Sequence, residues 1–461
     1  MNSYDSTPDK IQPVKLYCAR WVVPVATPAF EDGAVAVAGA RIVGVGARVE
    51  LAAQYKDAAC EDFGAAAIIP GLVNCHTHLE LTAMRGYLED VEGDFFAWLR
   101  KLTVAGMMRM TTDDLRVSAT WGACEAARAG VTTLGDASSY ADASMAALCE
   151  VGLRGIVYQE VISPDARVAD ELLSKLRADV LRLRELENEL VRVGVSPHTP
   201  FTVSERLLAG VTDYALAEQL PLMIHAAESA DEDELMRHGR GAFAESFAER
   251  GLEWRSPHMS PIQYLSERGV LATRPLLAHC VRVDAADIET IREAHASVAH
   301  CPKSNLKLGH GRAPFAQMRK LRRGFGSDSV ASNNTCDLLE EARFATLLAR
   351  LDAPGDELYT AAHALADATQ GGALALGYEG RTGTLRAGSE ADLAIVKLDG
   401  AHHLPVYDPA HALIFSSSAR DVALTLVAGR EVYRDGRITT VDEERLRARM
   451  AEIREKVNRE S

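Results

Sequence analysis

The sequence predicts an α/β protein in which a (β/α)8 barrel carries a small β-sandwich domain built from both chain ends. Three observations predict this fold. Short apolar runs alternate with amphipathic helical patterns through the middle of the chain, strand patterns occur at both ends, and histidines follow the apolar runs. A length of 461 residues accommodates a barrel of ~250 residues or more and a second, smaller unit.

Sequence patterns at both ends of the chain predict β-strands. Residues 14–25 are mostly apolar, and residues 29–45 alternate around two turn signals. A similar pattern returns within 391–433. Because chain termini often lie close together, we expect residues 1–67 and 376–440 to form one β domain. Residues 441–461 form a charged helical pattern at the C-terminus.

The segment between these ends, residues 68–375, alternates strands with helices. Its eight apolar runs are 71–75, 131–135, 153–161, 191–196, 222–225, 276–279, 297–300 and 324–326. Segments with apolar residues at three- and four-residue steps separate them. Eight such units predict a closed parallel barrel. An open, doubly wound sheet is the alternative, but no run is followed by a glycine fingerprint for a dinucleotide.

Composition and charge limit the binding partners and the cellular compartment that we expect for the protein. A net charge of −15 disfavours nucleic acid and anionic lipid, and no apolar run approaches the ~18 residues that span a bilayer. The first ten residues lack the pattern of an export signal, and the eight cysteines show no C-x-x-C spacing. We therefore expect a cytoplasmic protein that acts on a small molecule, without nucleic acid or membrane partners. The sequence is compatible with a homo-oligomer.

Histidine positions give the strongest functional signal. Six of the fourteen lie at the C-terminal end of a predicted strand: His76, His78, His198, His225, His279 and His300. Asp328 ends the eighth strand. In a parallel barrel all these ends meet at one rim, where active sites lie. The other eight histidines, at 238, 258, 295, 310, 363, 402, 403 and 411, are expected at the surface.

Four of these side chains predict a metal site. His76 and His78 are two residues apart, so both rings project to the same face of a strand. His225 and Asp328 complete a His3Asp set with an open position for water, which suits Zn²⁺. Two hydrogen-bonded core histidines are the alternative for the H-x-H pair alone. The end of the fourth strand, 196–200, carries no lysine that could bridge two metals, which favours one ion per chain.

Two further groups complete a hydrolytic site. Glu228 follows His225 by three residues and begins the loop at the same rim, where a carboxyl group can transfer protons between water and a ring nitrogen. A capping or surface glutamate is the alternative. His279 is placed to donate a hydrogen bond to the reacting centre.

Five segments resemble the amidohydrolase superfamily. They are IPGLVNCHTHL at 69–79, IHAAE at 224–228, AHC at 278–280, AHCPKSN at 299–305 and GSDS at 326–329. The resemblance covers nearly the whole chain, including GTLRAGSEADL at 383–393, where the family returns to its β domain. Within the superfamily the chain is similar to the branch of chlorohydrolases, guanine deaminase and adenosylhomocysteine deaminase. Segments 78–81, 98–102, 154–160 and 327–333 look most like aminodeoxyfutalosine deaminases.

The resemblance implies roles position by position. The metal ligands are His76, His78, His225 and Asp328; Glu228, His279 and Asp328 take part in catalysis; Trp98, Arg100, His198 and Asn305 contact the substrate. The cofactor implied is one Zn²⁺ per chain, with Fe²⁺ as an alternative.

The function predicted is metal-dependent deamination of a purine-like ring through a zinc-bound hydroxide. The substrate would be an adenine nucleoside derivative such as aminodeoxyfutalosine or S-adenosylhomocysteine. Two alternatives use the same site: a guanine or cytosine deaminase, and a triazine-type chlorohydrolase. A remote alternative is a catalytically inactive binding protein on the same fold, although a dead site has no need to keep a buried polar cluster.

Overall fold

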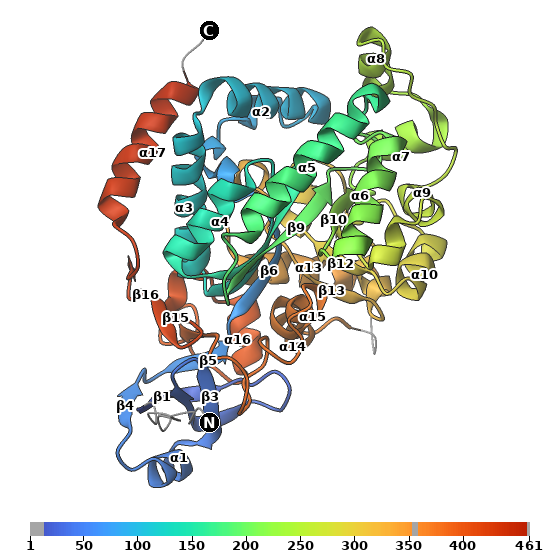
Figure 1. The fold of residues 1–461 in the computed structure, drawn as a ribbon. Coiled ribbons are helices and arrows are strands. Elements are labelled where there is room, and N and C mark those ends of the chain that lie inside the picture. The colour runs from blue at the N-terminus through green and yellow to red at the C-terminus, as the bar shows by residue number, and fades with distance from the viewer. Residues whose placement is uncertain (1–12, 353–357, 459–461) are drawn as a thin grey trace, which may run out of the picture.

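The computed structural model describes residues 13–352 and 358–458, and places a barrel beside a β domain built from both chain ends (Figure 1). The predicted absence of an export signal concerns residues 1–10, which lie outside the described residues. No helix within the described ranges is both long and apolar enough to cross a bilayer.

Eight parallel strands form the barrel. They are β6 (Leu72–Thr77), β7 (Val131–Ser138), β8 (Arg154–Val161), β9 (Val191–Pro197), β10 (Met223–Ala226), β11 (Leu276–His279), β12 (Ser297–His300) and β13 (Arg322–Phe325). They pair in order as two four-stranded sheets. A bridge between Val195 and Leu222 joins β9 to β10. On the other side the backbone N–H of Asp328 donates to the carbonyl oxygen of His76 at 2.9 Å. The predicted fold class is confirmed.

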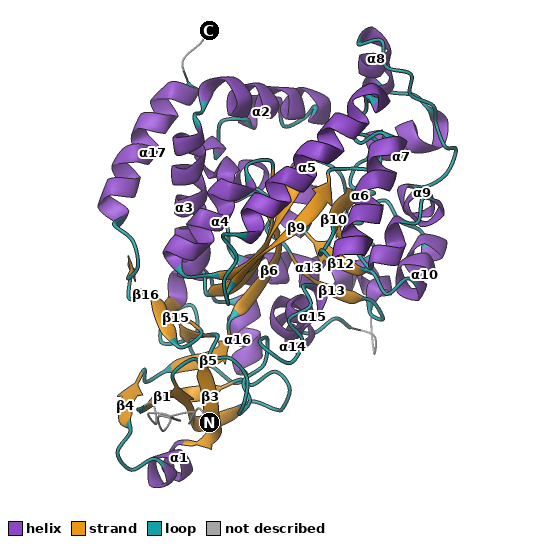
Figure 2. Ribbon diagram, viewed as in Figure 1, coloured by secondary structure: helices purple, strands orange, loops and turns teal. Residues whose placement is uncertain are grey.

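Helices surround this barrel (Figure 2). Those that cover the barrel between successive strands include α3 (Thr112–Arg128), α4 (Ala141–Val151), α5 (Ala169–Arg184), α6 (Glu205–Glu218) and α10 (Ala285–Glu293), and α13 (Leu338–Asp352) follows the last strand, β13. Longer excursions leave the carboxyl ends of the strands. They contain α2 (Phe95–Arg109) after β6, α7 (Ala230–His238), α8 (Ala242–Glu249) and α9 (Pro261–Glu267) after β10, α11 (Pro302–Lys307) after β12, and α12 (Val330–Asn333) after β13.

The β domain contains strands from both chain ends in one sheet. Its order is β17-β16-β15-β14-β5-β1-β2-β3, with β4 paired to β1. The strands are β1 (Val14–Val22), β2 (Phe30–Ala38), β3 (Arg41–Ala47), β4 (Ala59–Asp62), β5 (Ala66–Pro70), β14 (Leu393–Lys397), β15 (Val422–Val427), β16 (Arg430–Arg434) and β17 (Arg437–Ile438). The antiparallel pair of β5 with β14 joins the two ends. Apolar side chains of β1, β2, β14 and β15 share one buried cluster.

A buried ion pair connects the barrel to the β domain at the end opposite the histidine rim. Arg154, the first residue of β8, donates to Asp392 from Nε at 2.8 Å and from Nη2 at 3.2 Å, and also pairs with Glu390. Both Arg154 and Asp392 are buried. The charged C-terminal helix α17 (Glu443–Val457) instead lies beside α3 of the barrel (Figure 1), where its Lys456 pairs with Asp114 at 2.9 Å.

Candidate active site

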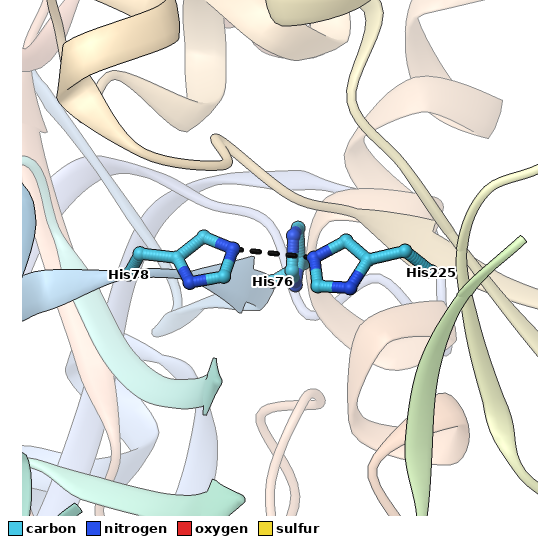
Figure 3. Close-up of side chains that lie close together, drawn as sticks. All are labelled: His76, His78 and His225. Atoms are coloured by element: carbon cyan, nitrogen blue, oxygen red, sulfur yellow. Dashed lines mark hydrogen bonds between the residues drawn. The ribbon is translucent and has the colours of Figure 1, made fainter. Parts of the chain in front are cut away.

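The rim brings together the four predicted ligand side chains. His76 and His78 come from β6 and the residue after it, His225 from β10, and Asp328 from the turn after β13. The Nε2 atoms of His78 and His225 lie 3.2 Å apart (Figure 3), and Asp328 Oδ1 lies 3.4 Å from His76 Nε2 and 3.6 Å from His78 Nε2. One carboxylate oxygen and imidazole nitrogens from three rings therefore face a common point.

Close backbone packing makes this convergence possible. A Cβ atom at Gly326 would lie only 2.8 Å from Cβ of His76, so glycine lets the eighth strand pass directly against the first. Asp328 adopts a φ of 56° and His279 a φ of 76°, in the left-handed region. Residues other than glycine rarely adopt this conformation, and where they do it often marks a functional site.

Hydrogen bonds orient the ligand atoms. The Nδ1 of His225 lies 2.8 Å from the carbonyl oxygen of His198, which fixes the proton on Nδ1 and leaves Nε2 with a free lone pair. The hydroxyls of Ser304 and Ser332 donate to Oδ2 of Asp328 at 2.5 and 2.9 Å, which directs Oδ1 toward the histidines. The sequence interpretation missed both serines, because they lie on the short helices α11 and α12 rather than at strand ends.

The residues fit a divalent metal ion. His76 is fully buried, and its Nε2 atom has no hydrogen-bond partner among the described residues. Burial lowers the pKa of His78 to about 3 and also lowers those of His76 and His225, so the three rings are neutral near pH 7. Burial alone would raise the pKa of Asp328, but His76 and neighbouring histidines hold it well below its ordinary value. Neutral imidazoles and an ionised carboxylate are the forms that bind a metal.

Glu228 and His279 lie together beside this cluster. Oε1 of Glu228 is 3.6 Å from Nε2 of His279, whose Nδ1 lies 2.9 Å from Oδ1 of Asn305. Glu232 accepts hydrogen bonds from the backbone N–H groups of Ala227 and Glu228, and so holds the turn that presents Glu228. Asn305, predicted to contact substrate, thus orients His279.

His310 corrects the sequence interpretation, which placed it with the surface histidines. It is buried, and its Nε2 lies 3.5 Å from Oε1 of Glu228. Burial would raise the pKa of Glu228, but His279 and His310 outweigh this effect and lower it. Glu228 is therefore ionised at neutral pH. His310 follows α11 in an irregular segment, where no periodic pattern could have indicated its direction.

The other predicted substrate contacts have different surroundings. The ring of His198 lies 4.9 Å from that of His225, and its Nδ1 is 2.8 Å from the Thr202 hydroxyl. Trp98 is buried in α2, among apolar side chains that include residues of α17. It stacks on Phe95, which in turn contacts His310 with ring centroids 4.5 Å apart. Arg100 is exposed on the same helix.

Comparisons with known proteins agree with this geometry. The sequence matches the Amidohydrolase family over residues 67–432. The chain belongs to this family. It is therefore a hydrolase that acts on carbon–nitrogen bonds other than peptide bonds.

Relatives extend along nearly the whole chain. A 5-methylthioadenosine/S-adenosylhomocysteine deaminase of Nitratidesulfovibrio vulgaris is 33% identical over 431 residues, which cover 92% of each chain. A zinc-bound adenosine deaminase of Xanthomonas campestris matches with a TM-score of 0.83 and 28% identity, over 97% of this chain and 99% of its own. The zinc complex of an atrazine chlorohydrolase of Arthrobacter aurescens matches with a TM-score of 0.81 and 24% identity, over 95% and 99%, and shows a shared fold.

Proposed function

We propose that the protein is a zinc-dependent aminohydrolase that removes the exocyclic amine of an adenine nucleoside. The observation that carries this proposal is the convergence of His76, His78, His225 and Asp328 beside an ionised Glu228. In this proposal those four residues hold one zinc ion. The names of the relatives, which refer to adenosine and its thioether derivatives, support the substrate class.

The chain's own residues would move the protons. When bound, zinc supplies the Lewis acidity that makes water nucleophilic near neutral pH. Glu228 would accept a proton from the attacking water and deliver it to the ring nitrogen next to the amine-bearing carbon. Asp328 Oδ1 would accept the second proton of that water and deliver it to the amine, which can then depart as ammonia. His279, kept in place by Asn305, would hydrogen-bond the oxygen that enters the ring, and ammonia would leave.

Substrate contacts in this proposal come from several segments. His198 would meet the ring or sugar near the rim, and Trp98 would support Phe95 from behind. Arg100, exposed on α2, would meet an acidic tail further out, as in S-adenosylhomocysteine or aminodeoxyfutalosine. An Arg100→Met variant should then raise KM for a carboxylate-bearing nucleoside by ~10-fold and leave adenosine nearly unaffected.

The test is ammonia release by zinc-loaded protein from a panel of amines. The panel contains adenosine, 5-methylthioadenosine, S-adenosylhomocysteine, guanine and cytosine. A chlorotriazine is tested in parallel, and its hydrolysis is measured as chloride release. We expect the adenine nucleosides to give the highest kcat/KM and chelator-treated protein to be inactive. Preference for guanine, or release of chloride with no deamination, would overturn the substrate class and leave only the hydrolase.

A further inference from the structure

Glu160 is a half-buried carboxyl group that the proposed mechanism does not use. It is the penultimate residue of β8, the third barrel strand. Ile156 and Tyr158, four and two residues earlier, belong to the apolar cluster inside the barrel with Val73 and Met223. Because side chains alternate along a strand, Glu160 points to the same interior face, one layer above Tyr158 and at the histidine rim.

The carboxyl group of Glu160 faces the active site. One of its oxygens and ring nitrogens of His198 and His225 all lie within 4.8 Å of one another. Oε2 accepts a hydrogen bond from the Ser139 hydroxyl at 3.2 Å. Oε1 is buried and has no hydrogen-bond partner among the described residues. A buried oxygen without a partner is costly, so a group that arrives with the ligand is the natural way to satisfy it.

The electrostatic surroundings define what that group can be. Burial raises the pKa of Glu160 to about 8, although Ser139 opposes the shift, and the nearby Asp136 and Asp328 raise it further. Burial raises the pKa of Glu80, a buried carboxyl group nearby, and both Asp136 and Glu160 raise it further. This concentration of acids repels an anionic part of a ligand. It accommodates a neutral hydrogen-bond donor.

An adenine nucleoside offers few donors of this kind. Its ring nitrogens present lone pairs, and its only N–H groups belong to the amine that is removed. The hydroxyl groups of the sugar are the donors that stay on the molecule through the reaction.

We propose that Glu160 is a specificity-determining residue whose Oε1 shares a hydrogen bond with the 2′ or 3′ hydroxyl of the substrate's sugar. This inference rests on the proposed function, because it takes the substrate to be a nucleoside. It assigns the third-strand side of the rim to the sugar and places any acidic tail away from it.

The experiment combines enzyme variants with substrates that lack single hydroxyls. Zinc-loaded wild type, Glu160→Ala and Glu160→Gln are assayed with adenosine, 2′-deoxyadenosine and 3′-deoxyadenosine, and kcat and KM are measured separately. We expect Glu160→Ala to raise KM for adenosine by up to ~10-fold, the upper end of the range for one lost hydrogen bond between neutral groups, with kcat within a few-fold. One of the deoxy substrates should be nearly indifferent to the substitution.

Controls separate this role from others. Glu185 is the exposed residue that directly follows α5, and Glu185→Gln should leave kcat and KM unchanged. Metal analysis should find the same zinc content in Glu160→Ala as in wild type. Glu160→Gln preserves the shape of the side chain and one accepting oxygen. It replaces the alanine variant as the test if that variant is insoluble. It should show a smaller rise in KM with the same dependence on the substrate.

Three results would overturn the inference. Loss of zinc from the Glu160 variants would make it a metal ligand. An equal rise in KM for adenosine and both deoxy substrates would assign it to the ring instead of the sugar, and unchanged constants would remove it from the site. Wild-type protein that deaminates none of these nucleosides would instead refute the proposed function, and this is decided before any variant is assayed.

Discussion

The two ends of the barrel bury polar groups in opposite ways. At the carboxyl ends of the strands, the buried Nε2 of His76 has no hydrogen-bond partner in the described part of the chain, and Asp328 and two other histidines face the same point. At the opposite end, Arg154 donates two hydrogen bonds to Asp392 and pairs with Glu390, so that only its Nη1 lacks a partner among the described residues, and Asp392 also accepts from the backbone N–H of Ala428 at 2.7 Å. An unsatisfied cluster indicates a ligand, whereas a paired one indicates a structural connection.

The largest effect is expected at the unsatisfied end. His76→Ala should abolish both metal binding and activity, because it removes a central donor from a fully buried cluster. Metal analysis and ammonia release, measured on the same preparation, check this. An active, metal-free variant would show that the rim does not work through a metal. Circular dichroism must first establish that the variant is folded.

Glu228→Gln should separate chemistry from metal binding at the same end. The amide cannot accept and deliver the proton, so kcat should fall by ~10²–10⁴ while the ion stays bound. Single-turnover kinetics and metal analysis provide the measurement. Loss of the ion would make Glu228 a ligand, and unchanged kcat would leave it as a loop carboxylate.

The paired end should respond in stability and not in chemistry. Asp392→Asn removes the charge facing the buried Arg154 and should lower the free energy of unfolding by about 3–5 kcal/mol, the usual cost of breaking a buried ion pair. Activity and metal content per folded molecule should persist. Denaturant titration of the variant and of wild type measures the change in the free energy of unfolding. A loss of activity from stably folded variant would show that this end of the barrel also contributes to catalysis, which contradicts the comparison.

The smallest effect is expected at a second histidine cluster, outside the barrel. His402, His403 and Asp421 also lie within 4.8 Å of one another. The side chain of His402 is 54% exposed, and Asp421 already accepts hydrogen bonds from the backbone and hydroxyl of Ser418. We expect His402→Ala to change neither zinc content nor kcat/KM. A drop in zinc content would show that His402, His403 and Asp421 bind zinc although they are partly exposed.

Strand periodicity and the position of polar residues after each strand were enough to predict the barrel and its four-residue cluster. Such patterns repeat locally, so they survive without knowledge of tertiary contacts. The same pattern could have revealed Glu160, which continues the inward series of Ile156 and Tyr158. A single glutamate at a strand end is a weaker sequence signal than paired histidines, because glutamate is common at exposed strand ends.

Other parts of the site depend on contacts that no local pattern contains. His310 reaches Glu228 from an irregular segment after α11, and Ser304 and Ser332 reach Asp328 from two separate short helices. His310 and Ser304 meet their partners because the barrel brings the segments after β10, β12 and β13 to one rim, whereas Ser332 reaches Asp328 through the turn that starts α12. Trp98 shows the converse: an aromatic residue that suggested a ligand contact packs among apolar side chains of α2 and α17.

The number of metal ions per chain tests the central claim most directly. Four ligand atoms face one point, and the end of β9, Ser196–Pro200, offers no lysine to bridge a second ion. Elemental analysis of wild-type protein after removal of loosely bound metal should find close to one zinc ion per chain, lost in His76→Ala. Two tightly held ions per chain, or none in a preparation that deaminates, would contradict the account.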